Sequence, residues 1–184
     1  MAKKNKVLVH LDGARIFNAA VYLRCDVKEL TGFCDSVMFC LSKGLCAPVG
    51  SILAGSKEFI SKARKYRKML GGGLRQAGVL AAACLVALNE MTGRLAEDHE
   101  NIKILAEGLG NIKGISIEQE TLQTNILMAD VAGAGYTASE LVNEMKDRGI
   151  LTHAITDRVI RFVTHHDVNR DDVEYAIQII KKTL

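Results

Sequence analysis

A run of apolar residues ends in a lysine between two small residues in the stretch SVMFCLSKG (residues 36–44). An earlier apolar run ends in an aspartate in the stretch VLVHLDGAR (residues 7–15). Short runs that are apolar at nearly every position predict strands buried on both faces, as in a parallel sheet. Between the two runs, residues 14–23 place their apolar side chains at helical spacing. The order strand, helix, strand predicts a right-handed, parallel βαβ unit.

Asp12 and Lys43 directly follow the two predicted strands. In a parallel unit both strands end on the same rim of the sheet, and ligands of open α/β sheets bind at that rim. We therefore expect Asp12 and Lys43 to face one site. From the residues alone, plainer roles stay open for both. Asp12 suits the cap of the helix that starts near Ala14, and Lys43 suits an exposed loop.

The next segments predict further elements of the same domain. The connection from Lys43 to Pro48 is too short for a parallel crossover, so the following strand should run antiparallel. Ser56 is placed to cap a basic helix, and the triple glycine at 71–73 should end that helix. The predicted elements are a strand at 49–54, the basic helix from 57, a buried Ala-rich helix at 76–91 and an amphipathic helix at 94–109.

The pattern changes after Gly110 and predicts a small α+β domain with a mostly antiparallel sheet. Its expected order is ββαββα, with strands at 115–119, 126–130, 150–153 and 159–163 and helices at 138–148 and 170–181. We therefore expect an α/β chain of two parts. Residues 1–109 form part of a larger domain with a bridging helix, and residues 110–184 form the small domain.

Composition excludes several classes of function. The chain has 184 residues, 48% of them hydrophobic and 24% charged, with a net charge of +3. This charge is too small to indicate nucleic-acid binding. No apolar run approaches the roughly 18 residues that span a membrane, and no signal-type segment follows the basic start. The five cysteines lack metal-type spacing, which indicates free thiols and no metal site. We expect a cytoplasmic protein.

Six basic residues lie between Lys57 and Lys68. A solvated helix face and a contact with an anionic ligand both fit this cluster. A nucleic-acid patch fits it less well, because no binding motif accompanies it.

Four blocks of sequence resemble one enzyme family. They are HLDGARIFNAA (10–20), SKGLCAPVGS (42–51), RKMLGGGLRQAG (67–78) and RLAEDH (94–99). Their order and spacing are similar to those of the low-specificity L-threonine aldolases. These are fold-type-I pyridoxal-phosphate enzymes, in the group that also holds the aromatic amino-acid β-eliminating lyases. The resemblance implies retro-aldol cleavage of L-threonine or L-allo-threonine to glycine and acetaldehyde. It also implies the C-terminal part of a fold-type-I large domain, followed by the small domain.

The resemblance implies a role for each of several residues. Lys43 would be the Schiff-base lysine, and Asp12 would hold the proton on the pyridine nitrogen of the cofactor. Arg15 and Arg161 would bind the carboxylate of an amino-acid substrate. The cofactor phosphate would be held by Ser42 and, from a neighbouring subunit, by Lys68 and Arg75. The resemblance therefore also implies a homo-oligomer, a dimer or a tetramer, in which two subunits contribute to each active site.

The sequence departs from the family pattern at two places. Cys46 stands where the family motif usually has glycine, so the turn is perturbed if that position needs a positive φ. The family's phosphate-binding segment, ring-stacking residue and candidate base lie upstream of the HLDGAR block, where this chain has only Met1 to Val9. Without the strands that the family has upstream of this block, the sheet should expose an apolar edge. The alternatives are therefore a catalytically incompetent fragment, a half-enzyme that needs a separate N-terminal half, or another β-eliminating lyase.

Overall fold

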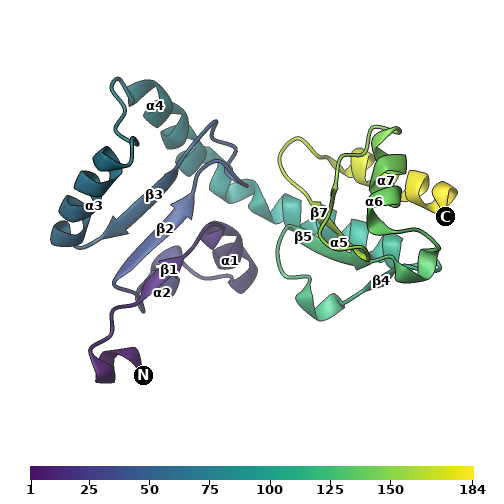
Figure 1. Cartoon of the computed structure of the whole chain (residues 1–184), viewed down its shortest axis with the longest axis horizontal. Coiled ribbons are helices and arrows are strands. Elements are labelled where there is room, and N and C mark those ends of the chain that lie inside the picture. Colours follow the sequence, from purple (N-terminus) through teal and green to yellow (C-terminus); the bar gives the residue numbers. More distant parts are fainter. The chain divides into compact units, whose positions relative to one another are not determined.

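A computed structural model describes residues 1–184. The chain forms two compact units, Met1–Leu95 and Ala96–Leu184. Figure 1 shows the order of the helices and strands along both units.

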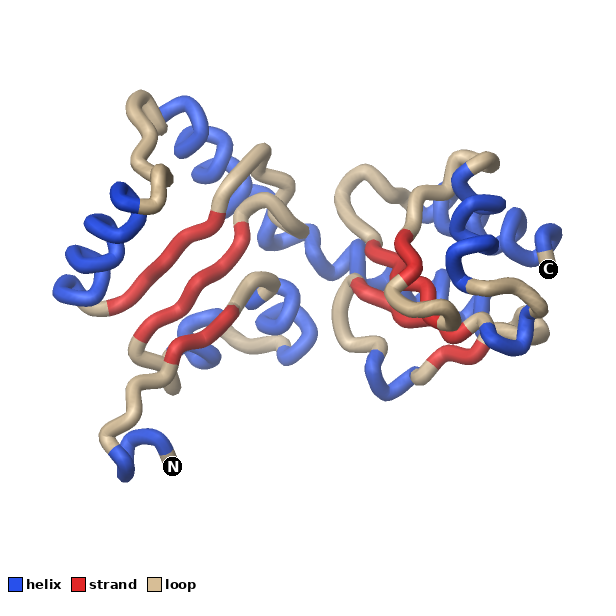
Figure 2. The backbone as a smooth tube through the Cα atoms, viewed as in Figure 1, coloured by secondary structure: helices blue, strands red, loops and turns tan.

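The first unit contains a three-stranded sheet in the order β1-β2-β3. Its strands are β1 (His10–Asp12), β2 (Ser36–Cys40) and β3 (Ser51–Gly55). β1 and β2 run parallel, whereas β2 and β3 run antiparallel. Figure 2 shows the three strands side by side. Both strand directions confirm the sequence predictions, and together they place the carboxyl ends of β1 and β2 at one end of the sheet.

Seven helical segments accompany this sheet. They are η1 (Ala2–Asn5), α1 (Ile16–Leu23), α2 (Val27–Thr31), α3 (Lys57–Met69), α4 (Gly78–Val86), the π-helical η2 (Ala87–Met91) and η3 (Thr92–Arg94). As predicted, Ser56 caps α3, because its side-chain oxygen accepts a hydrogen bond from the Phe59 N–H at 3.2 Å. Leu70 then ends α3, immediately before the triple glycine.

Two predictions of burial in the first unit are wrong. The strand expected at 7–11 begins only at His10, and Leu8 is 82% exposed. The reason is pairing, because β2 begins opposite His10, and before it only Val9 is bonded, to the N–H groups of Asp35 and Ser36 and to the Asp35 carboxylate. The helix expected to be buried is α4, in which no residue is buried and Val79 is 80% exposed. Of its residues, Cys84 packs against the small core of the first unit, whereas Val79, Leu85 and Val86 stay exposed.

The helical segments run on from α4 into α5 (Leu95–Gly110). By length and composition alone, the stretch Gly78–Gly110 is long and apolar enough to cross a membrane, although no uninterrupted apolar run of that length occurs in it. A core helix of a soluble protein meets the same criterion.

A small core lies beneath the loop that follows β2. Leu41 and Leu45 are almost fully buried and pack with Leu95. Phe17 and Phe39 pack edge to face at the margin of this core, with ring centroids 5.4 Å apart. Because Leu41 and Leu45 flank Lys43, their burial anchors the chain on both sides of that lysine.

The second unit is an antiparallel sheet in the order β4-β5-β7-β6. Its strands are β4 (Ser116–Ile117), β5 (Ile126–Asp130), β6 (His153–Ala154) and β7 (Val159–Val163). Its helices are α5, η4 (Gln119–Thr121), η5 (Ala132–Ala134), α6 (Ala138–Lys146) and α7 (Arg170–Thr183). The predicted order of strands and main helices after Gly110 is confirmed.

One face of this sheet carries the main core of the unit. Leu127, Ile160 and Phe162 point to that face and pack with buried residues of α5, α6 and α7. The intervening residues of β5 and β7 point the other way, and among them Met128 is 40% exposed. The second unit therefore offers one open sheet face.

Candidate active site

The loop that carries Lys43 is held by backbone hydrogen bonds. The Leu41 N–H donates to the Gly50 carbonyl at 3.0 Å, and the Ala47 N–H donates to the Leu41 carbonyl at 3.0 Å. Within the loop, the Cys46 N–H donates to the Lys43 carbonyl at 2.9 Å. The Lys43 side chain itself is exposed. The loop therefore presents a primary amine to solvent from a fixed backbone.

Gly44, the residue after Lys43, has no room for a side chain. A Cβ there would stand 3.0 Å from Leu95 Cδ2 and 3.3 Å from Asn18 Oδ1. Asn18 comes from α1 and is only 2% exposed, so a buried amide supports the Lys43 loop from below. Asn18 was not among the residues expected from sequence. The available signal was one polar residue among the apolar positions of the helix after Asp12.

Asp12 ends β1, opposite Met38 of β2. Its Oδ1 accepts a hydrogen bond from the Ala14 N–H at 3.1 Å, while Oδ2 makes no hydrogen bond. The helix-cap alternative is wrong, because α1 starts at Ile16 and its N-cap residue is Arg15. The Gly13 N–H donates to the Met38 carbonyl at 2.8 Å and fastens this turn to β2. The structure thus brings Asp12 and Lys43 to the same end of the sheet.

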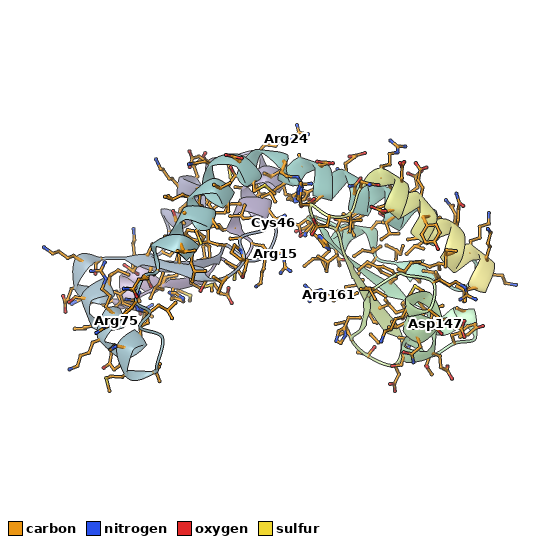
Figure 3. All side chains as sticks on the ribbon, turned by 90° about the horizontal axis from the view of Figure 1, so that it is seen from above. Arg15, Arg24, Cys46, Arg75, Asp147 and Arg161 are labelled. Atoms are coloured by element: carbon orange, nitrogen blue, oxygen red, sulfur yellow. The ribbon has the colours of Figure 1, made fainter.

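The two candidate carboxylate-binding arginines lie in different units. Arg15 is half-buried just before α1, and Arg161 lies in the middle of β7. Figure 3 shows Arg161 projecting from its strand away from α7. The Nε atom of Arg161 is buried and has no hydrogen-bond partner. A buried donor without a partner is costly, so this guanidinium is suited to receive an anion.

The candidate phosphate-binding residues all lie in the first unit. The Ser42 hydroxyl donates to the Gly50 carbonyl at 3.4 Å. The Lys68 side chain lies across Gly73, where a Cβ would come within 2.7 Å of Lys68 Cδ. Arg75 is exposed in the turn between α3 and α4 (Figure 3). Lys68 and Arg75 therefore occupy a different segment from the Lys43 loop.

Cys46 has a left-handed backbone, with φ at +57°. This is the conformation for which the glycine of the family motif is suited. The expected conflict at this position is therefore present in the structure. The cysteine side chain is exposed, and its thiol donates only to the Gly44 carbonyl, at 3.6 Å.

Comparison with curated proteins gives the same family as the sequence blocks. Low-specificity L-threonine aldolase 1 from Arabidopsis thaliana is 44% identical over 185 residues, which cover 100% of this chain and 52% of that protein. The low specificity L-threonine aldolase of Escherichia coli K12 is 43% identical over 171 residues, which cover 93% of this chain and 49% of that protein. The chain thus spans about half the length of the curated relatives it matches.

A solved structure shares the fold. Threonine aldolase from Leishmania major matches with a TM-score of 0.74 over 99% of this chain and 53% of its own length, at 15% identity. The expected class, a fold-type-I large-domain part followed by a small α+β part, is confirmed. A family model described as beta-eliminating lyase matches residues 1–132, well over half of the chain. The chain therefore belongs to the beta-eliminating lyase family.

Proposed function

We propose that this chain carries the cofactor lysine of a pyridoxal-phosphate-dependent lyase of the threonine aldolase type. The reaction is cleavage of L-threonine or L-allo-threonine to glycine and acetaldehyde. One observation carries the proposal: Asp12 and Lys43 follow the carboxyl ends of the neighbouring parallel strands β1 and β2. Ligands of open α/β sheets bind at that rim.

The residues fit pyridoxal phosphate. Lys43 offers a primary amine, the group that forms a Schiff base with an aldehyde, on a loop held by backbone hydrogen bonds. Asp12 Oδ2 makes no hydrogen bond, so it is able to accept one from a protonated ring nitrogen. When bound, the cofactor supplies a ring that accepts the electron pair left at the substrate Cα.

The roles of the side chains follow from their chemistry. The Lys43 amine would hold the cofactor by condensing with its aldehyde, with loss of water, and a substrate amine would take its place. The Asp12 carboxylate would keep a proton on the ring nitrogen. Arg15 and Arg161 each present a planar fork that binds a carboxylate bidentately. Held in this way, the substrate keeps the breaking Cα–Cβ bond in a productive orientation.

A homo-oligomer with shared sites is part of the proposal. Ser42 would hold the cofactor phosphate within one copy, and Lys68 and Arg75 would reach the phosphate of a second copy. The segment that carries Lys68 and Arg75 supports this arrangement, because Leu70 is 87% exposed and Leu74 is 68% exposed. Apolar side chains exposed together mark interaction surfaces. A cytoplasmic location also belongs to the proposal and is supported by five free cysteines.

The test is trapping of the cofactor on Lys43. The purified chain is mixed with pyridoxal phosphate, reduced with borohydride, and mapped by peptide mass spectrometry. We expect an adduct on Lys43 at low cofactor concentration, whereas the exposed Lys113 reports the background labelling of any lysine. The Lys43→Ala variant should lose the specific adduct and its absorption band. Equal labelling of Lys43 and Lys113 at every concentration would refute the proposal.

The β-eliminating alternative is separated by products. Chains loaded with pyridoxal phosphate, and not reduced, are assayed with L-threonine for glycine and acetaldehyde, and with amino acids that bear a β leaving group for pyruvate and ammonia. The proposal requires the first pair of products to dominate.

A second candidate is a half-enzyme that turns over only with another polypeptide. Two observations favour it: the chain covers 52% of its Arabidopsis relative, and both edge strands of the first unit lack a partner on their outer side. Adding the separately expressed N-terminal half of the Escherichia coli relative tests it. Activity that appears only in the mixture, and disappears with Lys43→Ala, supports this candidate. Equal activity without the added half excludes it.

A further inference from the structure

Three residues lie side by side across the sheet of the second unit. In the antiparallel register, Arg161 of β7 stands opposite His153 of β6 on one side and opposite Met128 of β5 on the other. The neighbouring pair, Ala154 and Ile160, belongs to the core face. Because side chains alternate along strands, His153 and Arg161 both point to the open face.

Directly opposite residues on one face of an antiparallel pair have Cβ atoms about 4.5–5.5 Å apart. The two side chains therefore reach the same small anion. His153 is exposed, and the buried Nε of Arg161 has no partner. The row thus contains two nitrogen donors, with the apolar Met128 beside them.

The charges around this row do not neutralise it. Asp130 lies on the same face, two pairs further along β5 and β7, and its Oδ2 accepts from Arg158 Nη2 at 2.8 Å. Arg161 and His153 are the other titratable groups that β6 and β7 place on this face. No carboxylate of the chain is bonded to either of them, so an external carboxylate is the missing counterpart.

We propose that His153 is a second carboxylate-binding residue beside Arg161. This inference rests on the role proposed above for Arg161 as a carboxylate-binding residue. An imidazole gains its charge near neutral pH, and like charges opposite each other in a sheet repel. A carboxylate between the two side chains removes that repulsion. Carboxylate binding and protonation of His153 therefore favour each other, and the site binds carboxylate more tightly as the pH falls.

The test follows the histidine ring signals of the full chain by NMR while sodium acetate or glycine is added. We expect a saturable shift of the His153 ring signal, and a titration midpoint that moves to higher pH when acetate is present. The His153→Gln variant should bind acetate about fivefold more weakly at pH 6, the effect of one exposed ion pair. At pH 8, the variant and the parent chain should bind acetate equally well. His166→Gln, which alters an exposed histidine of the loop after β7, is the matched control and should change neither value.

The outcomes separate this inference from the proposed function. A His153→Gln variant that binds acetate with unchanged affinity and unchanged pH dependence overturns the inference, as does the absence of any saturable shift. If the chain forms no specific Lys43 adduct but still responds to acetate, the lyase proposal is refuted and the carboxylate site is supported. Where turnover is measurable, His153→Gln should raise KM at pH 6 with little change in kcat, a split that a purely structural role would not produce.

Discussion

The amide of Asn18 lies against Gly44, so close that a Cβ on the glycine would stand 3.3 Å from Asn18 Oδ1. On the other side of the same glycine, Leu95 Cδ2 would be 3.0 Å away. Both neighbours are buried, Asn18 at 2% and Leu95 at 0% exposure. The loop that presents Lys43 therefore rests on a packed surface, and its shape depends on the two buried side chains beneath it.

Gly44→Ala tests this packing. The added methyl must displace Leu95 or Asn18, and overpacking of a core costs about 1–3 kcal/mol. We expect urea unfolding at a lower midpoint and weaker trapping of pyridoxal phosphate on Lys43. Gly78→Ala is the control, because nothing lies within 4 Å of a Cβ there and the residue is helical. A Gly44→Ala variant as stable as Gly78→Ala would show that the loop tolerates the methyl.

Cys46 allows a comparison of two small residues in a left-handed conformation. At φ +57° a residue with a Cβ is strained by about 1–2 kcal/mol relative to glycine. The unfolded chain has more conformational freedom with glycine, which lowers the free energy of unfolding of the glycine variant by about 0.5–1 kcal/mol. This offsets only part of the relief of strain. We therefore expect Cys46→Gly to unfold at a higher urea concentration than Cys46→Ala. The opposite order would mean that the turn has a different backbone in solution.

The strongest predictions from sequence were local ones. The strands at 126–130 and 159–163 match β5 and β7 residue for residue. Both are short apolar runs that leave no competing helical pattern. The Ser56 cap and the parallel pairing of β1 with β2 also followed from short-range rules. The parallel pairing alone was enough to predict that Asp12 and Lys43 lie at the same end of the sheet.

What could not be predicted depends on surfaces brought together by the fold. The apolar pattern of α4 predicts burial, but burial also requires a second surface, and none packs on Val79 within this chain. The contact of Asn18 with Gly44 depends on how α1 crosses the end of the sheet. The pairing of His153 with Arg161 depends on the register of β6, which the strand predicted at 150–153 overlaps at His153 alone.

Thr164 follows β7 and is held in a buried hydrogen-bond network. Its hydroxyl donates to the Asp98 carbonyl at 2.6 Å, and its own carbonyl accepts from Asn125 Nδ2 at 2.7 Å. Thr164→Val keeps the shape of the side chain and removes the first bond. We expect a loss of about 1 kcal/mol in the free energy of unfolding. Thr164→Ser keeps the hydroxyl and is the matched control for this bond.

The result for Thr164 is measured by urea unfolding of both variants beside the parent chain. The hydrogen-bond argument requires Thr164→Val to lose more from the removed bond than a partly buried hydroxyl in the last turn of α7 would. Thr183→Val serves that comparison, since its hydroxyl donates to Ile179 near the C-terminus. Equal losses for the two valine variants would contradict a special role for the network.

His99 makes the stability of the chain sensitive to acid. Burial is the largest cause that lowers the pKa of His99 below its usual 6.5, the neighbouring Asp98 raises it in part, and Lys103 lowers it further. Because the folded pKa is depressed, the unfolded chain binds more protons between the two values. The contribution of His99 to the free energy of unfolding is complete above pH 6.5 and falls as the pH drops through 6.5 toward the folded pKa. Urea unfolding between pH 8 and pH 5 should therefore show a decline that His99→Gln flattens and His166→Gln retains. Parallel declines in all three chains would mean that another group is responsible for the acid sensitivity.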